Sequence, residues 1–127
     1  MLFLCNGLSE SMKRDPNMKQ VPYSLSESEF IEVLHKSPYK SCIGHQELAD
    51  FLSKVVGKKI RYNRTHISVG YDDLILRVTV KGRLPEYPTH VEYRDRLEYS
   101  LIRFEKQSLE DYRESERIFN SLVGVEV

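Results

Sequence analysis

One apolar pattern constrains the fold of this chain more than any other feature. Between residues 48 and 56, five apolar side chains recur at positions i, i+3, i+4, i+7 and i+8, which lie on one face of an α-helix. Gly57 follows where a C-terminal cap belongs, and the helix is expected to begin between Ser41 and His45. The five residues are Leu48, Phe51, Leu52, Val55 and Val56. This segment therefore predicts an amphipathic helix that packs against an apolar partner.

Two capping patterns predict further helices. Ser26–Glu29 is a capping box, which opens a helix that runs to about Lys36 and must end before Pro38. Ser108–Asp111 shows a related pattern and opens a charged helix that runs to about Leu122. The polar segment 6–20 has few apolar residues and is predicted to be a loop.

Short apolar segments between these helices predict strands. Two of them, Ile67–Gly70 and Leu74–Val80, are expected to be joined by a turn at residues 71–73. The other expected strands are residues 1–5, Val21–Ser24 and Tyr99–Glu105. Strands interleaved with helices indicate an α/β or α+β fold. We expect a single domain with a central mixed β-sheet of about five strands flanked by helices, formed by residues 1–106, and a C-terminal helical extension over residues 107–127.

The charge balance limits the kind of ligand. The chain has 19 basic and 19 acidic residues among its 127, whereas proteins that coat long nucleic acids usually carry a basic excess. We therefore expect no long nucleic acid as a partner, and a bound nucleotide would be small. No apolar run reaches the length of a membrane span, and the N-terminus lacks the basic flank of a signal peptide, so a cytoplasmic protein is expected. In that compartment Cys5 and Cys42 are expected to be reduced and buried, with no zinc site.

The start of the predicted central helix could bind phosphate. The segment Ser41–Gln46 precedes the apolar stripe, and a helix N-terminus offers backbone N–H groups and a partial positive charge to an anion. Gly44 would allow a ligand to approach the backbone, and His45 could act as a general acid or base. The alternative is that His45 is an ordinary exposed residue of the first turn, and a single histidine does not decide between the two.

Arginines and a loop follow this helix. Arg61, Arg64, His66 and Arg77 could bind phosphate, although a solvated surface is the commoner role of such residues. Arg83 and Glu86 lie in a loop after a predicted strand, where sites of α/β sheets form, but they could simply pair with each other. The sequence has no Walker loop, G-x-S-x-G or H-E-x-x-H motif. A phosphodiesterase of this kind would work without metal or cofactor and would use the RNA 2′-hydroxyl as nucleophile.

Four short blocks resemble the viral ring-nuclease family of type III anti-CRISPR proteins. They are Leu4–Ser9, Ser41–Gln46, Tyr62–Arg64 and Gly82–Glu86. The resemblance covers roughly residues 1–105. The sequence departs from the family pattern at Pro85, in a shorter segment between Glu86 and Tyr99, and in the extension after about Gln107.

The resemblance implies a homodimer that binds the second messenger cyclic tetra-adenylate and cleaves it without metal to linear adenylates with 2′,3′-cyclic phosphate ends. In a virus, the enzyme would suppress type III immunity in the host cytoplasm. The implied catalytic residues are His45, Arg83 and Glu86. The implied substrate-binding residues are Asn6, Ser9, Gly44, Gln46 and Arg64. The alternative hypothesis is a non-catalytic module that binds a cyclic nucleotide or a protein as a sponge or regulator.

Overall fold

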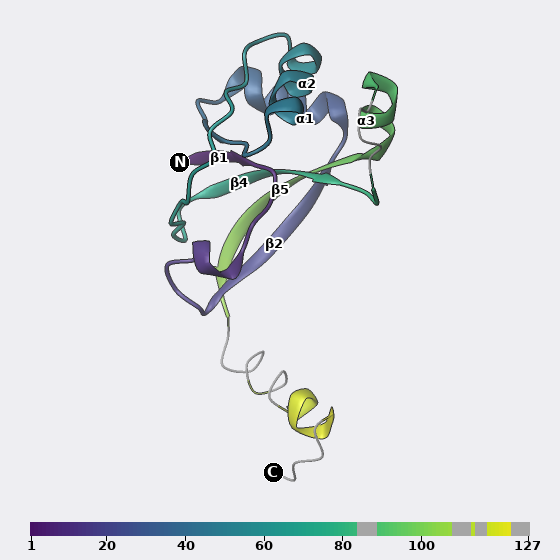
Figure 1. The fold of residues 1–127 in the computed structure, drawn as a ribbon. Helices are drawn as coiled ribbons and strands as arrows, with labels where there is room; N and C mark the ends of the chain where they lie inside the picture. Colours follow the sequence, from purple (N-terminus) through teal and green to yellow (C-terminus); the bar gives the residue numbers. More distant parts are fainter. Residues whose placement is uncertain (84–88, 108–112, 114–116, 123–127) are drawn as a thin grey trace.

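The computed structural model describes residues 1–83, 89–107, 113 and 117–122 of the 127-residue chain. One five-stranded mixed sheet, with the strand order β2-β5-β4-β1-β3, is flanked by helices (Figure 1). The strands are β1 (Leu2–Cys5), β2 (Met18–Leu25), β3 (Lys40–Cys42), β4 (Leu74–Val80) and β5 (Leu97–Lys106). The helices are the short 3₁₀ turn η1 (Glu10–Met12), α1 (Glu27–Lys36), α2 (Gln46–Val56) and α3 (His90–Arg96). The predicted α+β fold with about five strands is confirmed.

The strand directions bring several loops together. Strand β1 lies between β3 and β4 and is parallel to both, whereas β5 is antiparallel to β4 and to β2. Because β1, β3 and β4 are parallel, their carboxyl ends meet at one edge of the sheet, where ligand sites of such sheets form. The outer strand β2 contains Pro22, which has no N–H to donate and is tolerated at a sheet edge.

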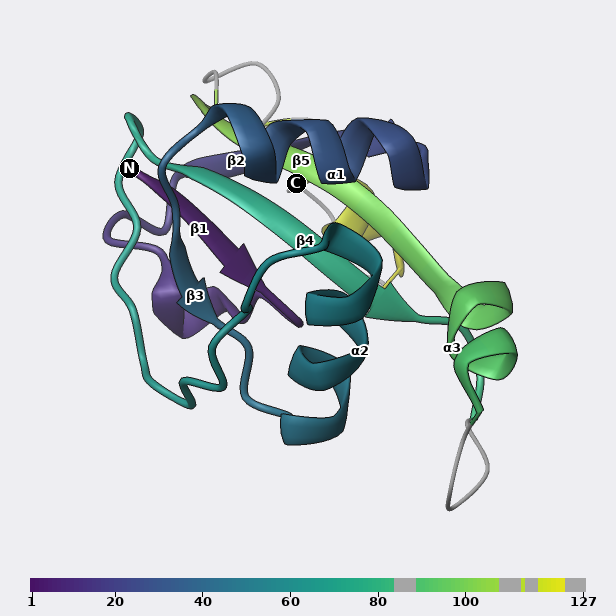
Figure 2. The ribbon, with the colours of Figure 1, turned by 90° about the horizontal axis from the view of Figure 1, so that it is seen from above.

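Each face of the sheet carries its own apolar core. Helices α1 and α2 cover one face (Figure 2), where Phe30, Leu34 and Leu52 are fully buried against Leu4 and Leu76. The predicted stripe of α2 faces this core, and Gly57 ends the helix in the left-handed conformation that glycine favours. The opposite face is covered by segments without long helices. Its core contains Phe3, Cys5, Met18, Cys42, Ile67, Val69, Ile75, Ile102 and Phe104.

The predicted hairpin before β4 is wrong. Ile67–Gly70 is not a strand; Ile67 and Val69 alternate with exposed residues because they pack on the second core, and Val69 forms only an isolated bridge with Lys13. The turn at residues 71–73 is present, with the N–H of Gly70 donating to Asp73 Oδ2 at 2.8 Å. Strand β4 pairs instead with β1 and β5, which come from distant parts of the sequence.

Four other elements differ from the expectation. Strand β3 was not predicted, because it has three residues and only Cys42 is buried. Strand β2 begins at Met18, inside the segment expected to be a loop, and η1 interrupts the same segment. Helix α3 was also missed, although Thr89 and Glu92 form a capping box whose T-x-x-E pattern is visible in the sequence.

The C-terminal part is described only in pieces. Residues 117–122 are helical and stand apart from the sheet in Figure 1. Most of the predicted helix Ser108–Leu122 lies outside the described residues, as do residues 123–127 of the predicted extension. No helix of the described chain is long and apolar enough to span a bilayer.

Candidate functional site

A cavity of about 650 Å³ opens at the carboxyl ends of β1 and β3, and we call it the site cavity. Three stretches of chain line it: the one that leaves β1, the one that leads from β3 into α2, and residues 64–65. Its lining residues are Cys5, Asn6, Gly7, Leu8, Ser9, Met12, Cys42, Gly44, His45, Arg64 and Thr65. Five of the eight site residues named from the sequence therefore surround one cavity.

A hydrogen bond joins the loops that follow the two parallel strands. The N–H of Gly44 donates to Asn6 Oδ1 at 3.0 Å, over 38 residues of sequence. This bond fixes the wall of the site cavity. It also uses the N–H of Gly44, one of the backbone groups that the sequence suggested for phosphate binding. Asn6 thus has a structural role beside any contact with a ligand.

His45 caps helix α2. Its Nδ1 atom accepts a hydrogen bond from the N–H of Leu48 at 3.3 Å, and its backbone is extended, as at a helix N-cap. An Nδ1 that accepts carries no proton, so the neutral ring has its proton on Nε2. The exposed ring lines the cavity and can present this Nε2–H group to a ligand.

Arg64 is positioned by a segment that runs along β3. The Ser41 hydroxyl donates to the carbonyl of Arg61 at 2.6 Å, and the Asn63 side chain donates to the carbonyl of Ser41 at 2.9 Å. These bonds hold residues 61–63 beside the strand and so place Arg64 at the cavity. A methyl group at Gly44 would lie 3.3 Å from Arg64 Cγ, so this glycine makes room for the arginine stem.

Two cysteines lie at the base of the site cavity. Cys5 and Cys42 are register partners on the parallel strands β1 and β3, and both are free and buried, as expected. Burial, together with the neighbouring Cys42, raises the pKa of the Cys5 thiol to about 12. Burial also raises the pKa of Cys42. Neither thiol is therefore a nucleophile near neutral pH.

Two other residues named from the sequence, Gln46 and Arg83, do not line the site cavity. Gln46 donates from its side-chain amide to Asp50 Oδ1 at 2.9 Å, along α2. Arg83 is exposed, and its carbonyl accepts from Arg96 Nη1 at 2.8 Å. Arg77 is the register partner of Cys5, and β4 continues for three residues past it. Arg83 therefore lies beyond the cavity. Glu86 lies outside the described residues.

The structure also adds residues that the sequence did not single out. Leu8 and Met12 line the cavity because the 3₁₀ turn η1 folds the N-terminal segment against the second core. Thr65 joins them beside Arg64, and no spacing rule in the sequence pointed to these three. Within the part of the chain that is described, no cluster of three or more His, Cys, Asp or Glu could hold a metal ion.

Comparisons with known proteins match the sequence to a family model and the fold to a solved structure. The family model described as STIV B116-like matches residues 2–105. Among solved structures, B116 of Sulfolobus turreted icosahedral virus is similar, with a TM-score of 0.68 and 20% sequence identity, over 80% of this chain and 97% of that chain. No curated protein matches the sequence.

Proposed function

The chain belongs to the STIV B116-like family and is related to a viral protein, and from this premise we propose that it is a metal-independent ring nuclease. Its substrate would be cyclic tetra-adenylate, and its biological effect would be to suppress type III CRISPR immunity in the cytoplasm of the host. Two supports carry the proposal: the resemblance of the four sequence blocks, and the convergence of their residues on one cavity.

That convergence is the main structural support. Asn6, Ser9, Gly44, His45 and Arg64 come from three stretches that span 58 residues from the first to the last, yet they line the same cavity. Its volume of about 650 Å³ lies within the range of roughly 300–1,000 Å³ that is common for small-ligand sites. Its cation, hydrogen-bond donors and imidazole suit a phosphodiester better than an apolar ligand.

The proposed reaction is an internal transfer at phosphorus. The 2′-hydroxyl of one adenylate gives its proton to solvent water and attacks the adjacent phosphorus, the bond to the 5′-oxygen breaks, and a 2′,3′-cyclic phosphate remains. Arg64 binds the phosphoryl oxygens, and His45 delivers a proton to the leaving 5′-oxygen. General acid catalysis contributes about 10²–10⁴-fold, so positioning and charge stabilisation supply the rest.

The helix cap imposes a condition on this role of His45. A ring that donates its proton as an acid is the imidazolium, in which Nδ1 also carries a proton and can no longer accept from Leu48. The capped ring offers only a hydrogen bond from Nε2. We therefore propose that His45 leaves the cap when it is protonated and returns to the cap after transfer.

A homodimer completes the proposal. A ring of four equivalent adenylates can present two equivalent phosphates to two copies of one site across a two-fold axis. The resemblance implies that Arg83 and Glu86 complete the catalytic set, from the same chain or from the partner copy. Without them, the described residues of one chain form a binding set with one proton-transfer group, which is the arrangement that the sponge alternative needs.

The test is cleavage of radiolabelled cyclic tetra-adenylate by an excess of purified protein in EDTA. We expect linear adenylates with 2′,3′-cyclic phosphate ends from the wild-type protein and intact ring from His45→Asn. Recovery of intact ring that remains bound to the wild-type protein would contradict catalysis and favour the sponge. An absence of both cleavage and binding would exclude cyclic tetra-adenylate as the ligand.

A further inference from the structure

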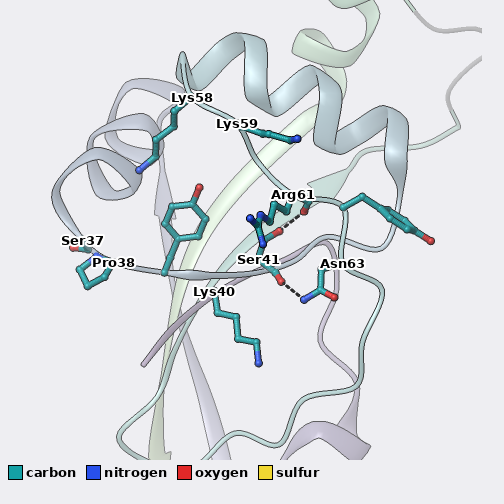
Figure 3. Close-up of a pocket in the computed structure, with 10 residues that line it drawn as sticks. Ser37, Pro38, Lys40, Ser41, Lys58, Lys59, Arg61 and Asn63 are labelled. Carbon is teal, nitrogen blue, oxygen red and sulfur yellow. Dashed lines mark hydrogen bonds between the residues drawn. The ribbon is translucent and has the colours of Figure 1, made fainter.

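A second cavity, of about 690 Å³, lies on the outer side of β3, and we call it the basic cavity (Figure 3). It is formed by residues 37–41, which lead into β3, and residues 58–63, which follow α2. Its lining residues are Ser37, Pro38, Tyr39, Lys40, Ser41, Lys58, Lys59, Arg61, Tyr62 and Asn63. It shares none of them with the site cavity.

The charge of this lining is one-sided. Four of the ten residues are cations and none is a carboxylate, although acidic and basic residues are equal in number over the whole chain. Lys58 is engaged, because its ammonium group donates to the carbonyl of Leu34 and lies 4.9 Å from the Tyr39 ring centroid. Lys40, Lys59 and Arg61 have exposed side chains and no acidic partner among the described residues. Three cations are thus available to an anion.

The backbone around these cations is well held. The Ser41 hydroxyl donates to the carbonyl of Arg61, and the Asn63 side chain donates to the carbonyl of Ser41, so the two segments are joined across the floor of the cavity (Figure 3). Because these contacts use the Arg61 carbonyl and not its guanidinium, the charged group stays free above Ser41. A free guanidinium with neighbouring ammonium groups is suited to phosphate.

An aromatic ring borders the same space. Tyr62 follows Arg61 directly, lines the cavity, and is 46% exposed, so that its ring is accessible to a ligand. Cations beside an exposed aromatic face are the elements that bind single-stranded nucleic acid, since phosphates meet the cations and a base stacks on the ring. The cavity volume of about 690 Å³ lies within the range of roughly 300–1,000 Å³ that is common for small-ligand sites, so only a short part of a strand would lie in it.

We propose that the basic cavity is a second binding site, which takes a short single-stranded oligonucleotide. Lys40, Lys59 and Arg61 bind its phosphates, and Tyr62 stacks on a base. The site is separate from the site cavity and does not rest on ring cleavage, because it uses residues on the other side of β3. Neither a histidine nor a carboxylate of the described chain lines it, so we assign it binding and no cleavage.

The test uses a fluorescein-labelled linear riboadenylate tetramer, with affinity measured by anisotropy in an Arg64→Ala background that weakens the site cavity. We expect the double variant Lys59→Gln/Arg61→Gln to bind about tenfold more weakly or worse. The slope of log affinity against log salt should fall by about 1.4 when two phosphate contacts are lost. The matched control, Arg103→Gln/Lys106→Gln, removes the same charge from β5 and should bind like the background protein.

Two further arms locate the ligand and test stacking. In an amide NMR titration with the unlabelled tetramer, the shifts should concentrate at residues 39–41 and 58–63. Tyr62→Ala should weaken binding by about 5- to 150-fold, whereas Tyr62→Phe should bind normally. Equal affinities of the double variant and its matched control, or shifts confined to the site cavity, would overturn the proposal, whatever the result of the cleavage assay.

Discussion

Helices α1 and α2 pack on the same face of the sheet but begin in different ways. Helix α1 starts with a full capping box, in which the Ser26 hydroxyl accepts from the N–H of Glu29 at 3.2 Å and the Glu29 carboxylate accepts from the N–H of Ser26 at 3.0 Å. Helix α2 starts with His45, a residue type outside the preferred N-caps, and has one cap bond of 3.3 Å. A local choice that departs from the best structural option is expected where a residue serves function. The weaker cap borders the site cavity, and the stronger one does not.

The largest expected effect comes from replacing the unusual cap with a common one. Asn is among the best N-caps, so His45→Asn should keep α2 capped while removing the proton-transfer group. We expect turnover of cyclic tetra-adenylate to fall by about 100-fold or more, with affinity within about tenfold of wild type. Single-turnover cleavage and equilibrium binding measure the two quantities.

A second variant separates the cap from the chemistry. His45→Ala should lose turnover to the same extent, and its free energy of unfolding should be lower than that of His45→Asn by about 1 kcal/mol. If His45→Asn cleaves at the wild-type rate, the histidine is only a cap and the difference between the two helix starts has no functional meaning.

The next prediction concerns the residue just before the histidine cap. In Gly44→Ala the new methyl group would crowd the Arg64 stem at 3.3 Å and displace the guanidinium from its place in the site cavity. We expect cyclic tetra-adenylate to bind about tenfold more weakly, since a hydrogen bond to a charged group is typically worth about 1.5–3 kcal/mol and only part of it is lost. Calorimetry in the His45→Asn background measures this binding without cleavage.

Gly7→Ala is the matched control for that variant. Gly7 lines the same cavity, but a methyl group there would meet nothing within 4 Å. Its affinity should stay close to that of the background protein. Equal losses in the two glycine variants would show that the contact between residues 44 and 64 is not what positions the arginine.

The capping box of α1 should behave in the opposite way to the histidine cap. Ser26→Ala removes the hydroxyl that accepts from Glu29, so the free energy of unfolding should fall by about 1 kcal/mol. Turnover should not change, because Ser26 lies outside the site cavity. Urea denaturation and the cleavage assay measure the two effects, and Ser28→Ala, which loses only a contact between hydroxyl groups, serves as the control. A loss of turnover in Ser26→Ala would contradict the view that only the cap of α2 serves the reaction.

Features that depend on neighbouring residues could be predicted from the sequence. The start of α1, the buried stripe of α2 and its glycine cap follow from residues at most a few positions apart. Strand β3 could not be predicted, because a strand of three residues is defined only by its pairing with β1. The partners of β4 could not be predicted either, because Ile67 and Val69 alternate with exposed residues through packing on the second core and not through strand pairing.

The same distinction holds for the candidate site. Residue types and the family resemblance pointed to His45, Arg64 and Asn6, which the structure brings to one cavity. The resemblance also named Arg83. The position of this residue depends on how far β4 extends past the end of β1, and the spacing of residues in the sequence does not encode that length. Only part of the basic cavity could be recognised in the sequence. Arg61 was named there as a possible phosphate ligand, whereas the tertiary structure brings Lys40 and Lys59 beside it.

The smallest expected effect is a pH dependence of the α1 capping box. The hydrogen bonds that Glu29 forms with the backbone and side chain of Ser26 hold the pKa of its carboxyl below the ordinary 4.5. A carboxyl whose pKa is lower in the folded state stabilises the protein above its unfolded pKa, and the contribution is lost as the pH falls through the folded pKa. The neutral Glu29→Gln variant can still form a capping box but has no such titration. The unfolding free energy of the wild type should therefore fall relative to that of Glu29→Gln as the pH is lowered from 7 to 3. A difference that stays constant over this range, measured by urea denaturation at each pH, would mean that the carboxylate charge adds nothing to the cap.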